Sequence, residues 1–484
     1  MTTQDSVPPS ASDVPPARPD MSGMSDTAGR IEVRGIDHIP DAERHGRPRE
    51  LFWVWLAANI TYLYFLLGGA MLLLGLTVWQ SVAVIVAGNL WWLGVGALAI
   101  TGPASGTPGV VVTRAMFGPR ANRPLSAGVG WLVSVAYIAV NLALSALAGL
   151  ALLSTSGVPN STAVEVGVLV AVGAGTVVIS VYGHATIVRL SSWFTAALAA
   201  AMVLLGAFVA ARADYSWAPT APLGGGKLWV ALFVGFTIIA SGPLSWQTGA
   251  DYARYLPRTT SRRAVLGWTA AGGLVPSVAL GVLGVLAGTR IDMNDPQTSI
   301  AQIVPAWFYP VFLLVVVVGF VTNNVLTTYS SGLCLQALGV PARRVTTVVI
   351  NFVLGGAIAA YALLGSETFL ATLNAILQLT VAFLGPAMAI YIVDIVLRRG
   401  RYDGIGLNDE TPRGPYWYRN GVNVPGVIAD VAGTVLAALS LSTSTWTGPI
   451  AGALDGADLS SVVGPLSAGL LYLLLWPRRR ANGL

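Results

Sequence analysis

GFTIIASGPLSWQTGADYARYLP, residues 235–257, is the stretch that decides the fold of this chain. It begins as an apolar helix, meets Ser241-Gly242-Pro243, and continues to a charged end. Because proline lacks a backbone donor and glycine tolerates unusual dihedral angles, the sequence predicts that the helix breaks at this tripeptide. Inside a membrane, a broken helix survives only where it is buried or lines a polar cavity. The break is therefore either a simple proline kink or a substrate site of the type found in secondary transporters.

The composition places the chain among proteins that cross a membrane many times. Of its 484 residues, 54% are hydrophobic and 10% are charged, and the mean hydropathy is +0.69. A spanning helix needs roughly 20 apolar residues. Twelve segments meet this requirement: 51–76, 79–101, 125–153, 163–182, 191–211, 228–250, 264–288, 306–333, 345–364, 368–396, 425–445 and 459–476. The predicted fold class is an all-α polytopic membrane protein with about twelve transmembrane helices.

These segments divide the chain into a core and flanking parts. Residues 1–50 are rich in Pro, Ser, Asp and Arg and contain no apolar run, so they predict a disordered or loosely docked cytoplasmic tail and not a signal peptide. The expected ten-helix core covers 51–396. It is followed by a cytoplasmic loop at 397–424, two additional helices at 425–476 and a basic cytoplasmic tail at 477–484.

The placement of basic residues predicts the orientation of the spans. With twelve spans, one side carries six Lys/Arg in residues 1–50 and eighteen more in its loops and the C-terminus. The other side carries only three, at Arg212, Lys227 and Arg290. By the positive-inside rule, both termini lie in the cytoplasm. Basic residues spread so thinly over short loops also argue against a nucleic-acid-binding surface.

The interior of the predicted spans is almost free of charge, because its deep polar residues are amides. They are Asn59, Asn141, Gln247, Asn323, Asn324, Asn374 and Gln378. An amide offers donors and an acceptor without a buried charge, which suits a neutral planar ring and disfavours a cationic one. Each amide taken alone could instead be a hydrogen-bonding contact between membrane helices.

The spacing of these residues favours a shared site. Tyr137 and Asn141 are four residues apart, as are Asn323 and Thr327, so each pair lies on one face of its helix. The carboxylates fall near predicted helix ends. For Asp394 and Asp430, as for Asp251 with Arg254, we expect ion pairing with nearby arginines.

The first span carries a second interruption. Asn59 and Thr61 are expected to stop the helix locally, and Gly68-Gly69 to allow close packing or another break. Spans one and six lie five spans apart. This pattern is typical of an inverted five-plus-five repeat, in which the corresponding broken helices face the binding site.

No enzyme motif competes with a transport function. The sequence contains no GxSxG elbow, HExxH pair or Walker A loop. Its single cysteine, Cys334, excludes an intramolecular disulfide and a cysteine-based zinc cluster. We expect no catalytic residue and no cofactor other than a coupling ion.

Seven motifs follow one another along the chain. They are Asn59 with GGAMLLLGL in the first span, SGTPGVVVTRAMFG (105–118), YIAVNLALSA (137–146), SWQTGADYARYLP (245–257), TNNVLTTYSSGLCLQALG (322–339), YIVDIVLRRGRYD (391–403) and YWYRNGVNVPGVIAD (416–430). In this order they resemble the nucleobase:cation symporter-1 family of the purine/cytosine permease type, from Ile36 to about Arg480. The resemblance implies a leucine-transporter-like fold, in which the first ten of twelve helices form two inverted repeats and helices one and six are broken.

The resemblance also implies a substrate site and an ion site. The implied substrate-binding residues are Tyr137, Asn141, Ser241, Gly242, Gln247, Thr327 and Asn59. Position 137 is usually Trp in this family, so Tyr137 offers a smaller stacking face with an added hydroxyl. Sodium-coupled members would hold Na⁺ between carbonyls near Ala57 and Ile60 and hydroxyls such as Thr322. The neighbouring Val321 leaves that hydroxyl set incomplete, and Na⁺ and H⁺ coupling both remain open.

The expected function is secondary active import of a neutral nucleobase, cytosine or a purine, across the plasma membrane by a monomeric symporter. The alternative is a permease for another neutral ring compound, such as allantoin, hydantoin, uracil or a thiamine-like base. A non-transporting sensor or a passive channel that keeps the fold is a further alternative.

Overall fold

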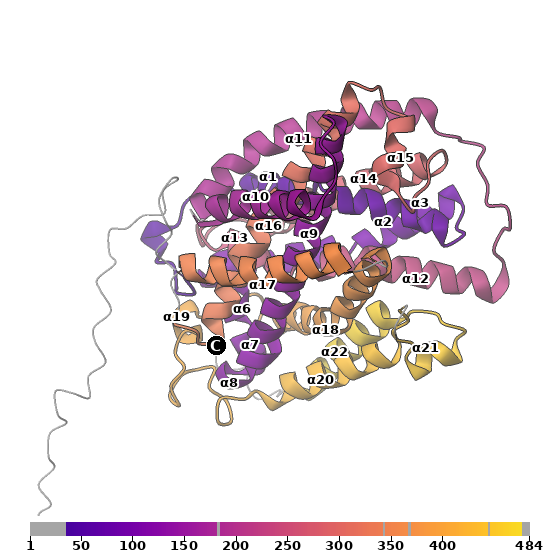
Figure 1. The fold of residues 1–484 in the computed structure, drawn as a ribbon. Helices are drawn as coiled ribbons and strands as arrows, with labels where there is room; N and C mark the ends of the chain where they lie inside the picture. Colours follow the sequence, from indigo (N-terminus) through magenta and orange to yellow (C-terminus); the bar gives the residue numbers. More distant parts are fainter. Residues whose placement is uncertain (1–34, 182–183, 342–343, 366–368, 444–445, 477–484) are drawn as a thin grey trace, which may run out of the picture.

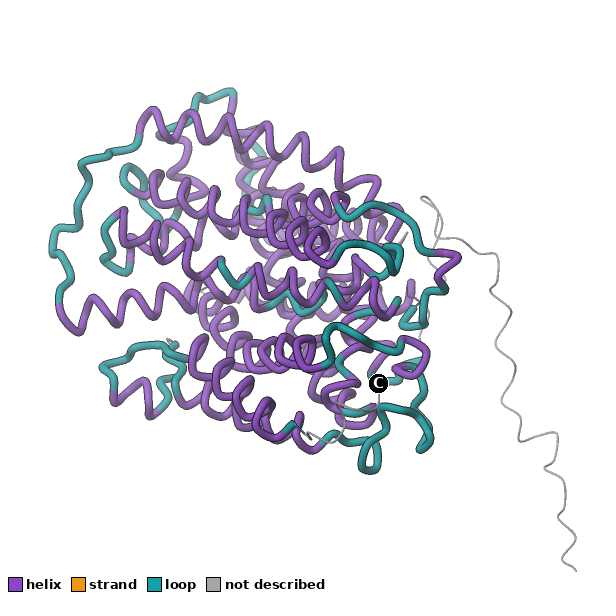
Figure 2. The backbone as a smooth tube through the Cα atoms, turned by 180° about the vertical axis from the view of Figure 1, so that it is seen from behind, coloured by secondary structure: helices purple, strands orange, loops and turns teal. Residues whose placement is uncertain are grey.

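The structure is a computed structural model that describes residues 35–181, 184–341, 344–365, 369–443 and 446–476. Within these ranges the chain is almost entirely helical, and β-pairing is confined to two isolated bridges. The helices form one bundle with short helices and loops at its two ends (Figure 1). Seen from behind, the long loop after Arg212 runs at the opposite end of the bundle from residues 35–48 (Figure 2).

The helices account for the twelve spans predicted from the sequence. Among the described residues, nine helical segments are long and apolar enough to cross a membrane, one bent pair forms a tenth span, and two shorter apolar helices complete the set. The first span is α1 (Arg49–Asn59) with α2 (Tyr62–Leu73), and the second is α3 (Val78–Asn89), α4 (Trp92–Ala99) and α5 (Thr101–Ser105). The others are α9 (Val129–Thr155), α10 (Thr162–Val181), α11 (His184–Arg212), α12 (Gly225–Leu244) with α13 (Gly249–Ala253), α14 (Arg262–Gly288), α16 (Phe308–Ala337), α17 (Arg344–Gly365), α18 (Phe369–Leu397), α20 (Val424–Leu439) and α22 (Ser460–Leu475).

The first span is broken where its sequence predicted. Helices α1 and α2 meet at an angle of 60°. Thr61 takes an extended conformation and caps α2, its side chain accepting a hydrogen bond from the Leu63 backbone at 3.4 Å. Asn59 joins the two halves, because its amide donates to Trp55 O at 2.7 Å and its Oδ1 accepts from the Tyr64 hydroxyl at 2.9 Å. These contacts satisfy polar groups that the break would otherwise leave unpaired in hydrocarbon.

The second break lies one turn later than predicted, so the expectation of a break at Ser241-Gly242-Pro243 was wrong. Helix α12 runs through Pro243 to Leu244, and the chain leaves the helix over residues 245–248 before α13 begins. Proline removes only its own N–H from the helix. The carbonyls of the tripeptide still accept, Ser241 O from Ser245 N at 3.1 Å and Pro243 O from Trp246 N at 3.1 Å. Because these two backbone hydrogen bonds are present, the helix ends after Leu244 and not at the tripeptide.

Glycines in α2 allow the broken first span to pack tightly against α14. A Cβ built on Gly68 would lie 1.9 Å from the Gly281 carbonyl oxygen, and one on Gly284 would lie 2.0 Å from the Phe65 carbonyl oxygen. Helix α2 continues through Gly68 and Gly69 to Leu73. Of the two roles expected for these glycines, close packing is therefore the one that the structure has.

We predict that Gly68→Ala destabilises the folded protein by about 1–3 kcal/mol, because the new methyl group meets backbone that cannot rotate away. Thermal unfolding of the detergent-solubilised protein measures the change. The control is Gly173→Ala in α10, where a Cβ would meet nothing within 4 Å. There alanine is expected to be neutral or stabilising, because it favours helix by about 1 kcal/mol over glycine. Equal stability of Gly68→Ala and the unsubstituted protein would contradict the prediction.

Residues 35–48, assigned to the tail by the sequence, lie against one end of the bundle, and we call them the N-terminal strap. Ile39 is fully buried, and its N–H donates to Gly106 O at 2.8 Å. His45 N donates to Tyr255 O at 2.6 Å, and the buried Arg254 donates to Gly35 O at 2.6 Å. We call the end of the bundle that carries the strap the strap face; it also carries α13 and the short helices α6 (Gly109–Val112), α7 (Arg114–Phe117), α8 (Pro119–Asn122) and α19 (Gly404–Leu407) (Figure 1). Residues 1–34 lie outside the described residues.

Candidate functional site

Three amides from two long helices meet in the centre of the candidate site. Asn141 of α9 donates through Nδ2 to Asn323 Oδ1 at 2.7 Å and to Asn324 Oδ1 at 2.9 Å, both on α16. We call Asn141, Asn323 and Asn324 the amide triad. All three are buried. Asn141 Oδ1 accepts no hydrogen bond from the described residues, so this acceptor is available to a donor on a ligand.

The amide triad is anchored at the first helix break. Asn323 Nδ2 donates to Ala58 O at 2.8 Å, in the last turn of α1. Helix α16 also passes close to the break itself, because a Cβ on Gly319 would lie 2.9 Å from the Ile60 carbonyl oxygen. A larger residue at 319 would therefore cover this carbonyl. The first break is thus held against α16 by the hydrogen bond from the Asn323 side chain and by the close approach of the backbone at Gly319.

Tyr137 connects the same region to α12. Its hydroxyl donates to Ser241 O at 3.4 Å, and the side chain is partly buried one turn before Asn141. Gly242 faces the ring of Tyr64, since a Cβ at this position would lie 3.0 Å from Tyr64 Cε1. The tripeptide predicted as the break is thus a helical surface that faces aromatic rings from α9 and α2.

The second break places polar groups between α12, α18 and α1. Gln247 lies within the break, and its Nε2 donates to Leu384 O of α18 at 2.5 Å. Thr248 Oγ1 is buried and has no hydrogen-bond partner among the described residues. Trp246 packs edge-on against Trp55 of α1, with ring centroids 5.2 Å apart. A buried hydroxyl without a partner is costly unless something hydrogen-bonds to it, and this one lies within the second break.

The structure brings most of the residues predicted for the substrate site together, and several of them use their polar groups for hydrogen bonds within the protein. Tyr137 and Asn141 share one face of α9, and Tyr137 contacts Ser241. Thr327 lies one turn beyond Asn323 and donates to Asn323 O at 3.0 Å. Asn59 uses its amide within the first span, as described above. Asn374 of the predicted amide set lies among residues whose side chains the structure does not describe.

The residues predicted for the ion site lie near the first break. Ala57 and Ile60 are buried at the end of α1. Thr322 is buried on α16, where its hydroxyl donates to Val318 O at 2.9 Å. That bond uses the hydrogen of the hydroxyl and leaves its oxygen lone pairs for an acceptor role.

Tyr64 was not assigned to this region from the sequence. Asn323 and Asn324 were expected in it as members of the deep amide set, but they were not among the substrate-binding residues that the family resemblance implied. For Tyr64 the only signal is an aromatic residue one turn after a predicted break. Sequence spacing along one helix cannot show which residues of other helices complete a site.

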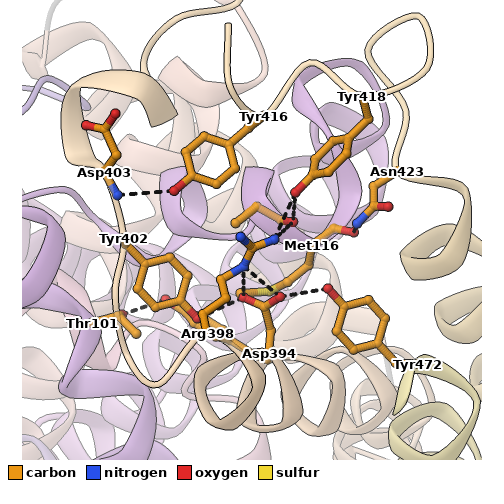
Figure 3. A network of polar contacts seen from close by, with 12 residues as sticks. Thr101, Met116, Asp394, Arg398, Tyr402, Asp403, Tyr416, Tyr418, Asn423 and Tyr472 are labelled. Atoms are coloured by element: carbon orange, nitrogen blue, oxygen red, sulfur yellow. Dashed lines mark hydrogen bonds and ion pairs between the residues drawn. The ribbon is translucent and has the colours of Figure 1, made fainter. Parts of the chain in front are cut away.

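The buried carboxylate Asp394 belongs to a separate network at the strap face (Figure 3). It is paired with Arg398, whose Nε lies 2.9 Å from Asp394 Oδ2. It also accepts hydrogen bonds from the hydroxyls of Tyr402 at 2.8 Å and Tyr472 at 2.7 Å. Arg398 in turn donates to Tyr418 OH at 2.9 Å. The expected ion pairing of Asp394 is confirmed.

The other two acids for which ion pairs were expected, Asp251 and Asp430, lie in α13 and α20. Asp251 Oδ1 accepts a hydrogen bond from Gly109 N at 2.8 Å, which ties α13 to α6. The expected pairing of Asp430 was wrong. Asp430 Oδ1 is buried on α20 without a hydrogen-bond partner, and its carboxylate forms no ion pair with the described residues.

At the opposite end of the bundle, Asp458 joins three helices. Its Oδ1 accepts from Ser460 Oγ at 2.6 Å, its Oδ2 from Gln378 Nε2 at 3.3 Å, and its backbone carbonyl from Thr237 at 3.2 Å. It precedes α22 and is fully buried. Burial raises the pKa of Asp458 from its ordinary value of 3.8 to about 6.

We predict that the folded protein loses stability as the pH rises from about 4 to about 6, because the folded state holds the Asp458 proton that the unfolded chain has released. The difference between the folded and unfolded pKa of Asp458 corresponds to about 3 kcal/mol of stability. Unfolding midpoints measured across this window should fall with pH in the unsubstituted protein and fall less in Asp458→Asn, which stays neutral. Asp292→Asn is the control, because that carboxylate is exposed in a loop and its pKa is lowered by hydrogen bonds from Asn294. An unchanged slope in Asp458→Asn would contradict the prediction.

Comparison with known proteins identifies the family to which this architecture belongs. Residues 38–464 match the family described as permease for cytosine/purines, uracil, thiamine, allantoin. YxlA of Bacillus subtilis, a candidate purine-cytosine permease, is 28% identical over 93% of this chain and 97% of its own length. The purine-cytosine permease fcyB of Emericella nidulans is 26% identical over 92% of this chain and 88% of its own length.

The fold is that of solved transporters. The structure of Mhp1, a nucleobase-cation-symport-1 family transporter in a closed conformation with bromovinylhydantoin bound, aligns with a TM-score of 0.72 at 20% identity, covering 91% of this chain and 94% of that one. An Na⁺-coupled sialic acid symporter aligns with a TM-score of 0.58 at 10% identity, covering 90% of each chain. The leucine-transporter-like fold expected from the sequence is confirmed. The chain is a multi-pass membrane protein that belongs to the family of permeases for cytosine/purines, uracil, thiamine and allantoin.

Proposed function

We propose that this permease imports a neutral nucleobase, cytosine or a purine, by alternating access. The observation that carries the proposal is the amide triad beside the two broken helices. Amides offer paired donors and acceptors that match the edge of a nucleobase ring, and they do so without a fixed charge that a neutral cargo would leave unpaired. The relatives named as purine-cytosine permeases support the same substrate class.

In this proposal the ring stacks on Tyr137 and its edge meets Asn141. Tyr137 presents an aromatic face one turn from the amide triad. Asn141 Oδ1 receives a ring donor, while Asn323 and Thr327 form the wall on α16. On the α12 side, Ser241 and Gly242 supply a helical surface without bulk, and Gln247 and Thr248 supply polar groups within the second break.

We further propose that a coupling cation lies at the first break. The carbonyls of Ala57 and Ile60 with the hydroxyl of Thr322 form an oxygen set that suits Na⁺, a hard cation. Proton coupling is the alternative. Uptake measured in Na⁺, K⁺ and choline media at fixed pH, and then across imposed pH gradients, distinguishes the two.

The charge distribution supports the orientation part of the proposal. The strap face carries most of the loop arginines, so we place it in the cytoplasm and the opposite end outside the plasma membrane. We propose a monomer as the transporting unit.

The proposal is tested by uptake of radiolabelled cytosine, adenine, uracil and allantoin into a transport-deficient host. We expect cytosine or a purine to accumulate above equilibrium and to be displaced by the unlabelled base. Preference for allantoin, hydantoin, uracil or a thiamine-like base would favour the alternative permease. Uptake that never exceeds equilibrium would show a channel, and the absence of both uptake and competition would refute nucleobase transport.

A further inference from the structure

The strap face contains a cavity that shares no residue with the candidate substrate site. Its volume is about 630 Å³, within the range of small-molecule sites. Its walls come from the N-terminal strap, the end of α5, the loop between α13 and α14, and residues 400–405 with Tyr416. Part of the last wall is visible in Figure 3, where Tyr402, Asp403 and Tyr416 lie together.

The cavity is lined by four arginines, of which two are held in place by backbone carbonyls. Arg44 donates to Ile39 O at 2.9 Å and to Pro103 O at 2.8 Å, and Arg262 donates to Arg399 O at 2.7 Å. Fixed guanidinium groups bind phosphate oxygens with less loss of side-chain entropy than mobile ones. The cavity is therefore partly preorganised for an anion.

The other two arginines are Arg258 and Arg401, and both are exposed. Neither forms a hydrogen bond or an ion pair with any residue that the structure describes. Arg258 also faces a like charge. The pKa of Arg44 is lowered, first by burial of the guanidinium and also by the positive charge of Arg258. An anion between these groups would relieve that repulsion.

The acidic residues of the cavity do not neutralise these two arginines. Asp41 lies 3.1 Å from Arg44 and is paired with it. Asp403 accepts hydrogen bonds from Ile405 N and Gly406 N at the start of α19. His38 adds little positive charge at neutral pH, because burial lowers its pKa from 6.5. The cavity thus keeps an excess of positive charge at Arg258 and Arg401.

We propose that this cavity binds a phosphate-bearing anion, with Arg258 and Arg401 as its unpaired ligands and Arg44 and Arg262 as its fixed ones. Phosphate is the chemistry that several convergent guanidinium groups recognise best, because each can donate two parallel hydrogen bonds. The phosphate comes either from a soluble cytosolic compound or from the headgroup of an anionic phospholipid. A bound anion would join the strap to residues 258–262 and 400–405.

The test uses the full chain purified in phosphatidylcholine nanodiscs and measures binding directly. In one arm, inorganic pyrophosphate is titrated by calorimetry; in the other, phosphatidylglycerol is added to the nanodisc lipid and retained lipid is counted by native mass spectrometry. We expect saturable binding in one arm, weakened about tenfold or more by Arg258→Gln with Arg401→Gln. Pyrophosphate binding alone would identify a soluble phosphate, and retained phosphatidylglycerol alone a lipid headgroup.

The matched control is Arg413→Gln, an exposed arginine of the same face that does not line the cavity. It removes one charge without touching the site and should bind as the unsubstituted protein does. The proposal is overturned if neither arm shows saturable binding, or if Arg413→Gln weakens binding as much as the double variant. Because the readout is binding of phosphate and involves no transported base, failure here is distinguishable from failure of nucleobase uptake.

Discussion

Asn141→Ala is expected to reduce uptake by at least about tenfold, whichever neutral ring is the substrate. The side chain donates to both Asn323 and Asn324 and leaves its own oxygen open to a ligand. Removing it leaves Asn324 Oδ1 without its donor and leaves Asn323 Oδ1 with only the long 3.4 Å hydrogen bond from Thr327. An acceptor left unsatisfied in a buried position costs about 1–3 kcal/mol. Initial uptake rates over a range of substrate concentrations, normalised to surface expression, measure the loss.

Ser145→Ala is the matched control for this substitution. Ser145 lies one turn further along α9 and is fully buried, and its one side-chain hydrogen bond to the described residues is a long one, 3.4 Å to Val317 O on the same partner helix. We expect it to retain most of the uptake. If Asn141→Ala transports with unchanged affinity and rate, Asn141 is not in the substrate site, and the role of the amide triad is confined to packing α9 against α16.

Asp394→Ala is expected to lower the free energy of unfolding by about 3–5 kcal/mol, the cost of leaving a buried charge unpaired. Asp394 is fully buried, and the Arg398 side chain beside it is 9% exposed. The substitution also removes the acceptor of the Tyr402 and Tyr472 hydroxyls, which connect the residues after α18 and helix α22 to α18 (Figure 3). Denaturant unfolding in detergent micelles measures the loss.

The exposed ion pair between Arg123 and Glu410 provides the contrast. It spans 2.7 Å, but the Arg123 side chain is 49% exposed, so Arg123→Ala should cost no more than about 1 kcal/mol. Asp394→Leu with Arg398→Met should recover much of the stability lost in Asp394→Ala, because no charge is then left buried. Similar losses for Asp394→Ala and Arg123→Ala would show that the Asp394 network does not stabilise the fold.

Most of the architecture could be predicted from the sequence, because hydropathy and charge placement are properties of each segment by itself. The twelve apolar segments correspond to helices, and Asn59 with Thr61 marks the first break within a residue. The near absence of charge in the spans likewise indicated a neutral interior before any contact was known. The family motifs then agreed with the fold.

The position of the second break could not be predicted from the sequence, because it depends on which backbone hydrogen bonds form after Pro243. Pro243 removes one donor, yet the N–H groups of Ser245 and Trp246 still donate to carbonyls of the tripeptide, and the helix continues to Leu244.

The partner of each carboxylate could not be predicted from the sequence either. Asp394 and Asp430 both lie near helix ends in the sequence, but only Asp394 meets an arginine and two tyrosines from distant segments.

The sequence by itself therefore determined that the chain crosses a membrane about twelve times, with two interrupted helices and a polar but uncharged interior. The tertiary structure alone decided that Asn141, Asn323 and Asn324 form one cluster. These residues stand up to 183 positions apart, and a hydrogen bond between them depends on the distance and orientation of two packed helices. Only the tertiary structure, too, brought Arg44, Arg258 and Arg401 around one cavity, because they come from three segments with no shared pattern in the sequence.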